Sequence, residues 1–187
     1  MKSEVRIIAG QWRGRKLPVV DAAGLRPTPD RIRETLFNWL AADCHDAVVL
    51  DCFAGSGALG LEALSRGARR LVAIERDRQA LRNLEALRHR LGDARFELLA
   101  GDALQRVDDL DTVFDIVFVD PPYADDVLRM AIVERLEAAN CLRNGCRIYF
   151  EWPHGSDAEP VSPRLHWLKR KSAGQVDYGV AEWRRTG

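Results

Sequence analysis

The residues best suited to chemistry are four that follow an apolar run at 114–119: Asp120, Pro121, Pro122 and Tyr123. Two successive prolines fix the backbone and leave exposed carbonyl oxygens, because proline has no N–H donor. A carboxylate beside such a carbonyl offers two acceptors for the two hydrogens of an exocyclic amino group, and Tyr123 offers a flat face for stacking on a base. Such an amine is a weak nucleophile, so positioning and electrostatics must supply much of the acceleration. The corner therefore predicts methylation of the amino group of a base that is unpaired or flipped out of a duplex.

A second candidate site is the glycine-rich stretch at 53–60, between an apolar run at 47–52 and a predicted helix. Gly55, Gly57 and Gly60 match G-x-G-x-x-G in the strand–turn–helix context that the motif needs. Glu75 ends the next apolar run, where a carboxylate can accept hydrogen bonds from ribose hydroxyls. Together these features predict a bound cofactor that contains adenosine.

Asp51 favours one of two candidate cofactors, a dinucleotide and S-adenosylmethionine. It lies at the mouth of the glycine loop, where it would repel a pyrophosphate but attract an ammonium and a sulfonium group. A methionine carboxylate could then bind the loop N–H groups and the helix N-terminus. Asp102, after a third apolar run, could accept a hydrogen bond from an adenine amino group or could simply cap a helix.

The elements that must position these residues change character along the chain. Short strands are expected at 5–9 and 16–20, and a helix capped by Thr28 with Pro29 and Asp30 in its first turn. From residue 47 onward, continuous apolar strands alternate with helices, which predicts an α/β fold whose parallel sheet is covered on both faces. We expect strands at 47–52, 71–75, 95–99, 114–119 and 146–151, helices at 58–66, 77–91 and 126–138, and a closing antiparallel hairpin from 165–171 and 175–184.

Charge is distributed unevenly although the 28 basic and 28 acidic side chains balance. The net charge is +4 over residues 1–40, −8 over 41–163 and +4 over 164–187, and 24 of the basic residues are Arg. Arg matches phosphate geometry well, so the two basic ends could attract a polyanion. The alternative is a set of ordinary solvated charges.

Other features narrow the class of protein. The 187 residues suit one globular domain, and no apolar run is long enough to span a bilayer or resembles a secretory signal. The four cysteines form no C-x-x-C pair, and no histidine lies at zinc-like spacing, so no metal site is expected. We expect a soluble cytoplasmic protein with reduced thiols, and a monomer because no heptad or large apolar stripe demands a partner.

The chain resembles the RsmD family of bacterial 16S ribosomal RNA guanine-N2 methyltransferases, which are class I S-adenosylmethionine-dependent enzymes. The glycine loop, the acidic strand end and Asp-Pro-Pro-Tyr mark the chemistry. The narrower resemblance is carried by stretches at 6–17, 25–40, 50–66 and 173–178. It implies a doubly wound, Rossmann-like methyltransferase sheet of seven mostly parallel strands over 29–187, with a small basic β extension and loop at 1–28 that helps to dock RNA.

The same resemblance implies roles for individual residues. Asp120, Pro121, Pro122 and Tyr123 would hold the guanine, and Thr28 would close over the methionine end. The remaining cofactor-binding residues would be Asp51, Phe53, Ala54, Gly55, Ser56, Gly57, Gly60, Glu75, Arg76, Asp102 and Ala103.

RNA phosphates would be contacted by basic residues near both ends of the chain. Arg31 and Glu34 lie at helical spacing and could instead pair with each other. The partner would be 16S RNA in an assembled or assembling small subunit, with ribosomal proteins contributing because the overall charge is zero. The expected RNA-binding residues are Arg6, Arg13, Arg15, Lys16, Arg26, Arg31, Arg33, Lys169, Arg170 and Lys171.

Three other functions fit parts of the pattern. An amino methyltransferase could act on adenine-N6 or cytosine-N4 of DNA, or on a protein glutamine, although the chain has no room for a separate DNA target-recognition domain. An NAD(P)-dependent oxidoreductase shares the glycine loop, but Asp51 and the two prolines argue against it. A non-catalytic RNA-binding assembly factor could retain the fold, but it would not need Asp-Pro-Pro-Tyr.

Overall fold

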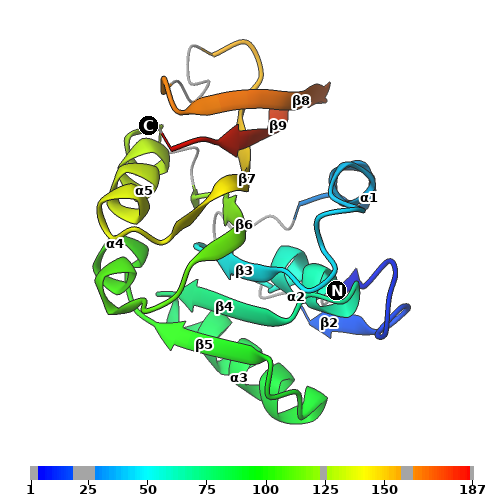
Figure 1. Cartoon of the computed structure of the whole chain (residues 1–187). Coiled ribbons are helices and arrows are strands. Elements are labelled where there is room, and N and C mark those ends of the chain that lie inside the picture. Colours follow the sequence, from blue (N-terminus) through cyan, green and yellow to red (C-terminus); the bar gives the residue numbers. More distant parts are fainter. Residues whose placement is uncertain (1–3, 19–27, 123–125, 157–161, 186–187) are drawn as a thin grey trace.

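A seven-stranded sheet forms the centre of the computed structural model, which describes residues 4–18, 28–122, 126–156 and 162–185 (Figure 1). The strand order is β5-β4-β3-β6-β7-β9-β8. Strands β3 to β7 pair in parallel, whereas β9 is antiparallel to both β7 and β8. The strands are β3 (Val48–Asp51), β4 (Arg70–Glu75), β5 (Phe96–Ala100), β6 (Phe114–Val119), β7 (Leu142–Pro153), β8 (Leu165–Ala173) and β9 (Val176–Trp183).

Helices cover both faces of this sheet, as the continuous apolar strands require. One face packs against α1 (Asp30–Trp39), α2 (Ala58–Ser65) and α3 (Arg78–Leu91), and the other against α4 (Ala103–Arg106), the short 3₁₀ helix η1 (Val107–Asp109) and α5 (Asp126–Ala138). Neighbouring strand residues alternate between the two cores: Val49 faces the first and Leu50 the second. The predicted α/β fold, with a mostly parallel sheet and a closing antiparallel hairpin, is confirmed.

A separate two-stranded antiparallel sheet precedes α1, formed by β1 (Glu4–Arg6) and β2 (Lys16–Pro18). The loop between these strands lies against the C-terminal end of α2. Ser65 accepts a hydrogen bond from the N–H of Trp12 at 2.9 Å and donates one to the carbonyl of Ala9 at 2.6 Å. Trp12 itself is buried in the same core as the helices on that face. The basic extension is therefore held firmly on the larger sheet.

Several element boundaries differ from those expected; β1, for example, ends at Arg6 and not at residue 9. Pro29, not Thr28, is the N-cap residue of α1, and its side chain forms no capping hydrogen bond. The Thr28 hydroxyl instead hydrogen-bonds to Glu151. Strand β7 begins at Leu142, four residues earlier than expected, because Leu142 pairs with Phe114 before an irregularity in the register.

Candidate active site at the carboxyl ends of β3, β6 and β7

Three carboxylates lie where three neighbouring parallel strands end. Asp51 is the last residue of β3, Asp120 follows β6, and Glu151 lies near the end of β7. Asp51 pairs with Phe118, and Val119 pairs with Phe150, so the register brings Asp120 beside both neighbouring strand ends. Because β3 and β6 lie at the centre of a doubly wound sheet, this edge is the expected place for a ligand.

The glycine loop joins β3 to α2 through backbone conformations that only glycine adopts freely. Gly57 is the N-cap residue of α2 with φ +77°, and its N–H donates to the carbonyl of Ala54 at 2.6 Å. Gly55 also has a positive φ, of 53°. Gly60 lies so close to β3 and β4 that a Cβ there would stand 3.1 Å from Asp51 Oδ2 and 2.7 Å from Leu71 Cδ1. The loop is thus compact, and Ala54, Gly57 and Gly60 are buried while Phe53, Gly55 and Ser56 remain half-exposed.

Asp51 is buried against the start of α2. Its Oδ2 accepts a hydrogen bond from the Gly60 N–H at 3.1 Å, and only 4% of its surface is exposed. Loss of solvent raises the pKa of Asp51 to about 7; the N–H groups of Gly60 and Phe53 oppose this rise, and the nearby carboxylate of Glu75 adds to it. Such a carboxyl group would be stabilised in its charged form by a cation bound at the loop.

Glu75 and Asp102 continue this edge at the ends of β4 and β5. Glu75 accepts hydrogen bonds from the N–H groups of Gly55, Arg76 and Asp77 at 2.7 to 2.8 Å. Asp102 accepts the Leu104 N–H at 3.0 Å and so caps α4. Helix capping was one of the two roles expected for this residue, beside binding of an adenine amino group. Its other oxygen lies 3.4 Å from Arg76 Nη1, so the side chains of Arg76 and Asp102 are brought together. Ala103 follows as a buried first residue of α4.

Asp120 interacts electrostatically with acidic and basic neighbours. Burial, followed by the carboxylates of Glu151 and Asp51, raises the pKa of Asp120 well above its usual value, whereas the guanidinium of Arg129 opposes the rise. Glu151 accepts a 2.5 Å hydrogen bond from the Tyr149 hydroxyl and another from Thr28. Burial also raises the pKa of Glu151, against these hydrogen bonds. Next to Asp120, Pro121 is buried and Pro122 half-buried, while Tyr123 lies outside the described residues.

Three residues at this edge were missed by the motifs: Glu151, Tyr149 and Arg129. Glu151 did carry a signal, because it ends an apolar run in the same way as Asp51 and Asp120. Arg129 carried none, since an Arg within a helix is ordinarily solvated, yet only 1% of its surface is exposed.

Most of the expected RNA-binding residues lie at the surface, but Arg33 does not. Arg33 is completely buried and donates hydrogen bonds to the Arg6 carbonyl at 2.8 Å and to Asp30 at 2.6 Å. It therefore joins α1 to β1, and the expectation that it contacts phosphate was wrong. Arg26 lies outside the described residues, and no ion pair joins Arg31 to Glu34 in the described structure. The exposed residues are Arg6, Arg13, Arg15, Lys16, Arg31, Lys169, Arg170 and Lys171.

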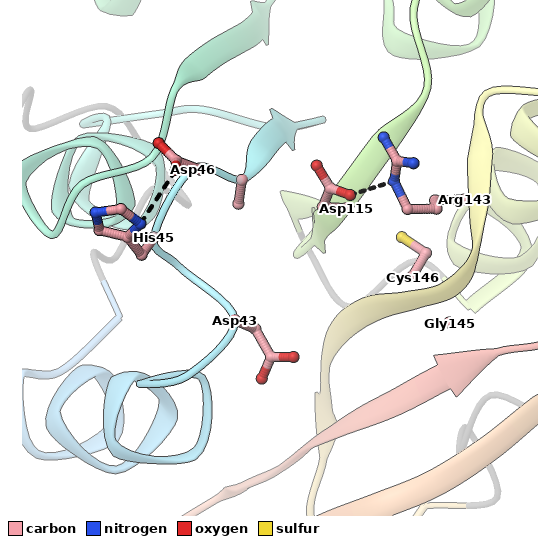
Figure 2. A pocket seen from close by; sticks show the side chains of 8 residues that line it. Asp43, His45, Asp46, Asp115, Arg143, Gly145 and Cys146 are labelled. Atoms are coloured by element: carbon pink, nitrogen blue, oxygen red, sulfur yellow. Dashed lines mark hydrogen bonds and ion pairs between the residues drawn. The ribbon is translucent and has the colours of Figure 1, made fainter.

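A surface pocket also lies at the opposite edge of the sheet, where β3 and β6 begin (Figure 2). Its polar side chains form pairs, including His45 with Asp46 and Arg143 with Asp115. Because the opposite charges of each pair already compensate each other, this pocket offers less to a ligand than the edge with Asp51 and Asp120, and it is not the candidate active site. Elsewhere in the described part of the chain, no group of three His, Cys, Asp or Glu side chains is arranged to hold a metal ion. None of the described helices is long and apolar enough to cross a membrane.

Comparison with known proteins places the chain in a family. Residues 5–182 match the family model described as Conserved hypothetical protein 95. The Ribosomal RNA small subunit methyltransferase D of Escherichia coli (strain K12) is 49% identical over 181 residues, which cover 94% of this chain and 88% of that protein. The protein of the same name from Haemophilus influenzae is 42% identical over 185 residues, covering 95% of this chain and 93% of that protein.

The solved structure of a putative methyltransferase from Escherichia coli superposes with a TM-score of 0.87 at 42% sequence identity, covering 98% of this chain and 100% of that chain. Similarity at this level over nearly the whole length confirms the expected resemblance. The chain therefore belongs to the Conserved hypothetical protein 95 family, together with the proteins named ribosomal RNA small subunit methyltransferase D.

Proposed function

We propose that this protein transfers a methyl group from S-adenosylmethionine to the exocyclic N2 amino group of a guanine in 16S ribosomal RNA of the small subunit. The observation that carries the proposal is the pairing of β3 with β6, which sets the glycine loop and Asp51 next to Asp120 and its two prolines. The name shared by relatives up to 49% identical supports the RNA substrate. The choice of guanine rests on the family resemblance.

The residues around the glycine loop fit S-adenosylmethionine by their charge. Asp51 is a buried carboxyl group beside the loop, and a cation would favour its ionised form, whereas the pyrophosphate of a dinucleotide would not. The N-terminal end of α2 offers N–H groups to a carboxylate. Glu75 and Asp102 would bind the ribose and the adenine, and Thr28 would cover the methionine end. When bound, the cofactor supplies an electrophilic methyl group.

The protein itself would hold the amine. The Asp120 carboxylate and the Pro121 carbonyl would accept the two amino hydrogens, which aims the nitrogen lone pair and stabilises the positive charge that develops on nitrogen. These hydrogen bonds favour the ionised form of Asp120 and so oppose the effect of burial on its pKa. Tyr123 would stack on the base. As the bond from nitrogen to the methyl group formed, the bond from the methyl group to the cofactor sulfur would break, and one amino proton would leave to solvent to restore a neutral amine.

The decisive experiment uses small-subunit particles that lack the modification, a labelled methyl donor and nucleoside analysis of the product. We expect N2-methylguanosine from the wild-type protein. Asp120→Ala should lower kcat at least about 10²-fold, the usual effect of removing one group that stabilises the transition state, while cofactor affinity stays near the wild-type value. Asp109→Ala, the same change at a side chain that is 55% exposed, is the matched control.

A wild-type rate for Asp120→Ala would refute the catalytic assignment. Recovery of N6-methyladenosine or N4-methylcytidine would refute guanine as the target base. Comparing naked 16S RNA with particles tests the substrate further: equal rates would exclude a contribution from ribosomal proteins.

A further inference from the structure

A second basic surface lies at the edge of the sheet opposite to Asp120. Arg69, Arg70 and Arg95 line a pocket there together with Glu97. Arg70 is the first residue of β4, and Arg95 immediately precedes β5, whereas the candidate active site lies where the strands end. The six residue steps along β6 from its start to Asp120 separate the two edges by roughly 20 Å.

The guanidinium groups of this pocket outnumber its acidic partners. Arg70 forms an ion pair with Glu97 at 2.7 Å, and Arg95 forms one with Asp93 at 2.6 Å. Arg69 is exposed, and its side chain contacts no carboxylate among the described residues. Arg70 keeps 37% of its side-chain surface exposed and donates only through Nη2 to Glu97, so it can still bind an outside anion. Arg95 already donates from all three guanidinium nitrogens, to Asp93, the Ala68 carbonyl and Gln11, so it contributes mainly its positive charge.

The loop between β1 and β2 extends this surface. Arg95 Nη2 donates a hydrogen bond to Gln11 Oε1 at 3.0 Å, which joins the pocket to the loop. The Gln11 N–H in turn donates to the Ser65 carbonyl at 2.7 Å, so the backbone there is held by α2. Arg13 and Arg15 are exposed on the same loop. A preformed surface of this kind binds without first having to order itself.

We propose that Arg69, Arg70 and Arg95, with Arg13 and Arg15, dock the phosphate backbone of a second RNA segment of the substrate particle, remote from the base that is methylated. This inference rests on the proposed function, since the particle supplies the RNA. Guanidinium forks match phosphate oxygens, and phosphate contacts position a protein on RNA without reading its sequence. At roughly 20 Å from Asp120, the surface adds affinity for the particle but touches no reacting atom.

The test compares Arg69→Ala and the double variant Arg69→Ala/Arg70→Ala with Arg135→Ala. Arg135 lies on α5, at the opposite face of the sheet. It is a matched control because its side chain is 50% exposed and pairs with a single carboxylate, that of Asp108. We expect the double variant to raise KM for particles about tenfold with kcat unchanged. The slope of log affinity against log salt should fall by about 2, one for each lost phosphate contact. Arg135→Ala should change neither.

Arg69→Ala alone keeps the test clear of folding defects, because it removes no ion pair; it should raise KM about threefold and lower the salt slope by about 1. An unchanged KM for both variants, or a loss in kcat instead, would overturn the proposal. A raised KM with unchanged salt slope and unchanged affinity for naked 16S RNA would assign the surface to a protein partner and refute RNA. If wild-type protein methylates no particle, the proposed function fails, whereas the binding measurements still decide this surface.

Discussion

The buried carboxyl group of Asp51 predicts that cofactor affinity rises with pH across neutrality. Its pKa is raised to about 7, chiefly by burial, with the nearby carboxylate of Glu75 adding to the rise. The carboxylates of Asp51 and Asp120 also repel each other, and, in addition to burial, the charge of Asp51 raises the pKa of Asp120. In the proposed complex, the ammonium of S-adenosylmethionine would favour the ionised form of Asp51, so a protonated Asp51 would lose its proton before or as the cofactor binds.

The magnitude follows from the titration. With a pKa near 7, roughly a tenth of the molecules have Asp51 ionised at pH 6 and roughly nine tenths at pH 8. If the ionised form binds, the dissociation constant for S-adenosylmethionine should fall about tenfold between these pH values, which is about 1.4 kcal/mol. At pH 7, binding should release about half a proton from Asp51.

Isothermal titration calorimetry measures both quantities, because two buffers of different ionisation enthalpy report the number of protons released. Asp51→Asn keeps the size of the side chain and an oxygen for the Gly60 N–H, and it should abolish the part of the pH dependence that Asp51 causes. The ammonium of the ligand titrates equally in both proteins, so their difference isolates Asp51. Asp109→Asn, at an exposed carboxylate, should behave as wild type. Equal pH dependence in wild type and Asp51→Asn would refute this role.

Two further predictions concern the docking of the N-terminal loop on α2. Gly10→Ala would place a Cβ 1.9 Å from the Ser65 carbonyl oxygen at φ +82°, whereas at Gly14, which has the same φ, a Cβ would have no atom within 4 Å. In urea unfolding, Gly14→Ala should lower the free energy of unfolding by about 1–2 kcal/mol, and Gly10→Ala by at least about 2 kcal/mol more. Equal losses would contradict the close contact. Glu62 is fully buried, accepts the Ile8 and Ala9 N–H groups at 2.7 and 3.0 Å, and faces the buried Arg33 at 3.7 Å. Glu62→Gln should therefore lower the free energy of unfolding by about 3 kcal/mol, whereas Glu34→Gln, at an exposed position, should lower it by less than about 0.5 kcal/mol. A loss below about 1 kcal/mol for Glu62→Gln would show that this charge does not hold the loop.

Local sequence determined the elements and the motifs, because each depends on neighbours in the chain. Apolar runs such as 114–119 predicted buried parallel strands, and all six residues of that run became β6. The three loop glycines predicted a turn between a strand and a helix, and the structure has that turn, with a positive φ at Gly57. The position of Asp51 and Asp120 at strand ends was also predictable, since parallel strands end at a common edge.

Tertiary structure decided which charged side chains are buried and what each one contacts. Arg33 and Arg129 look like ordinary surface residues of helices, yet Arg33 is enclosed by β1, α1 and Glu62, and Arg129 faces Asp120. The grouping of Arg69, Arg70 and Arg95 with Gln11 likewise depends on how β4, β5 and the N-terminal loop meet. Burial and electrostatic pairing arise from segments far apart in the chain, so no local pattern of residues could reveal them.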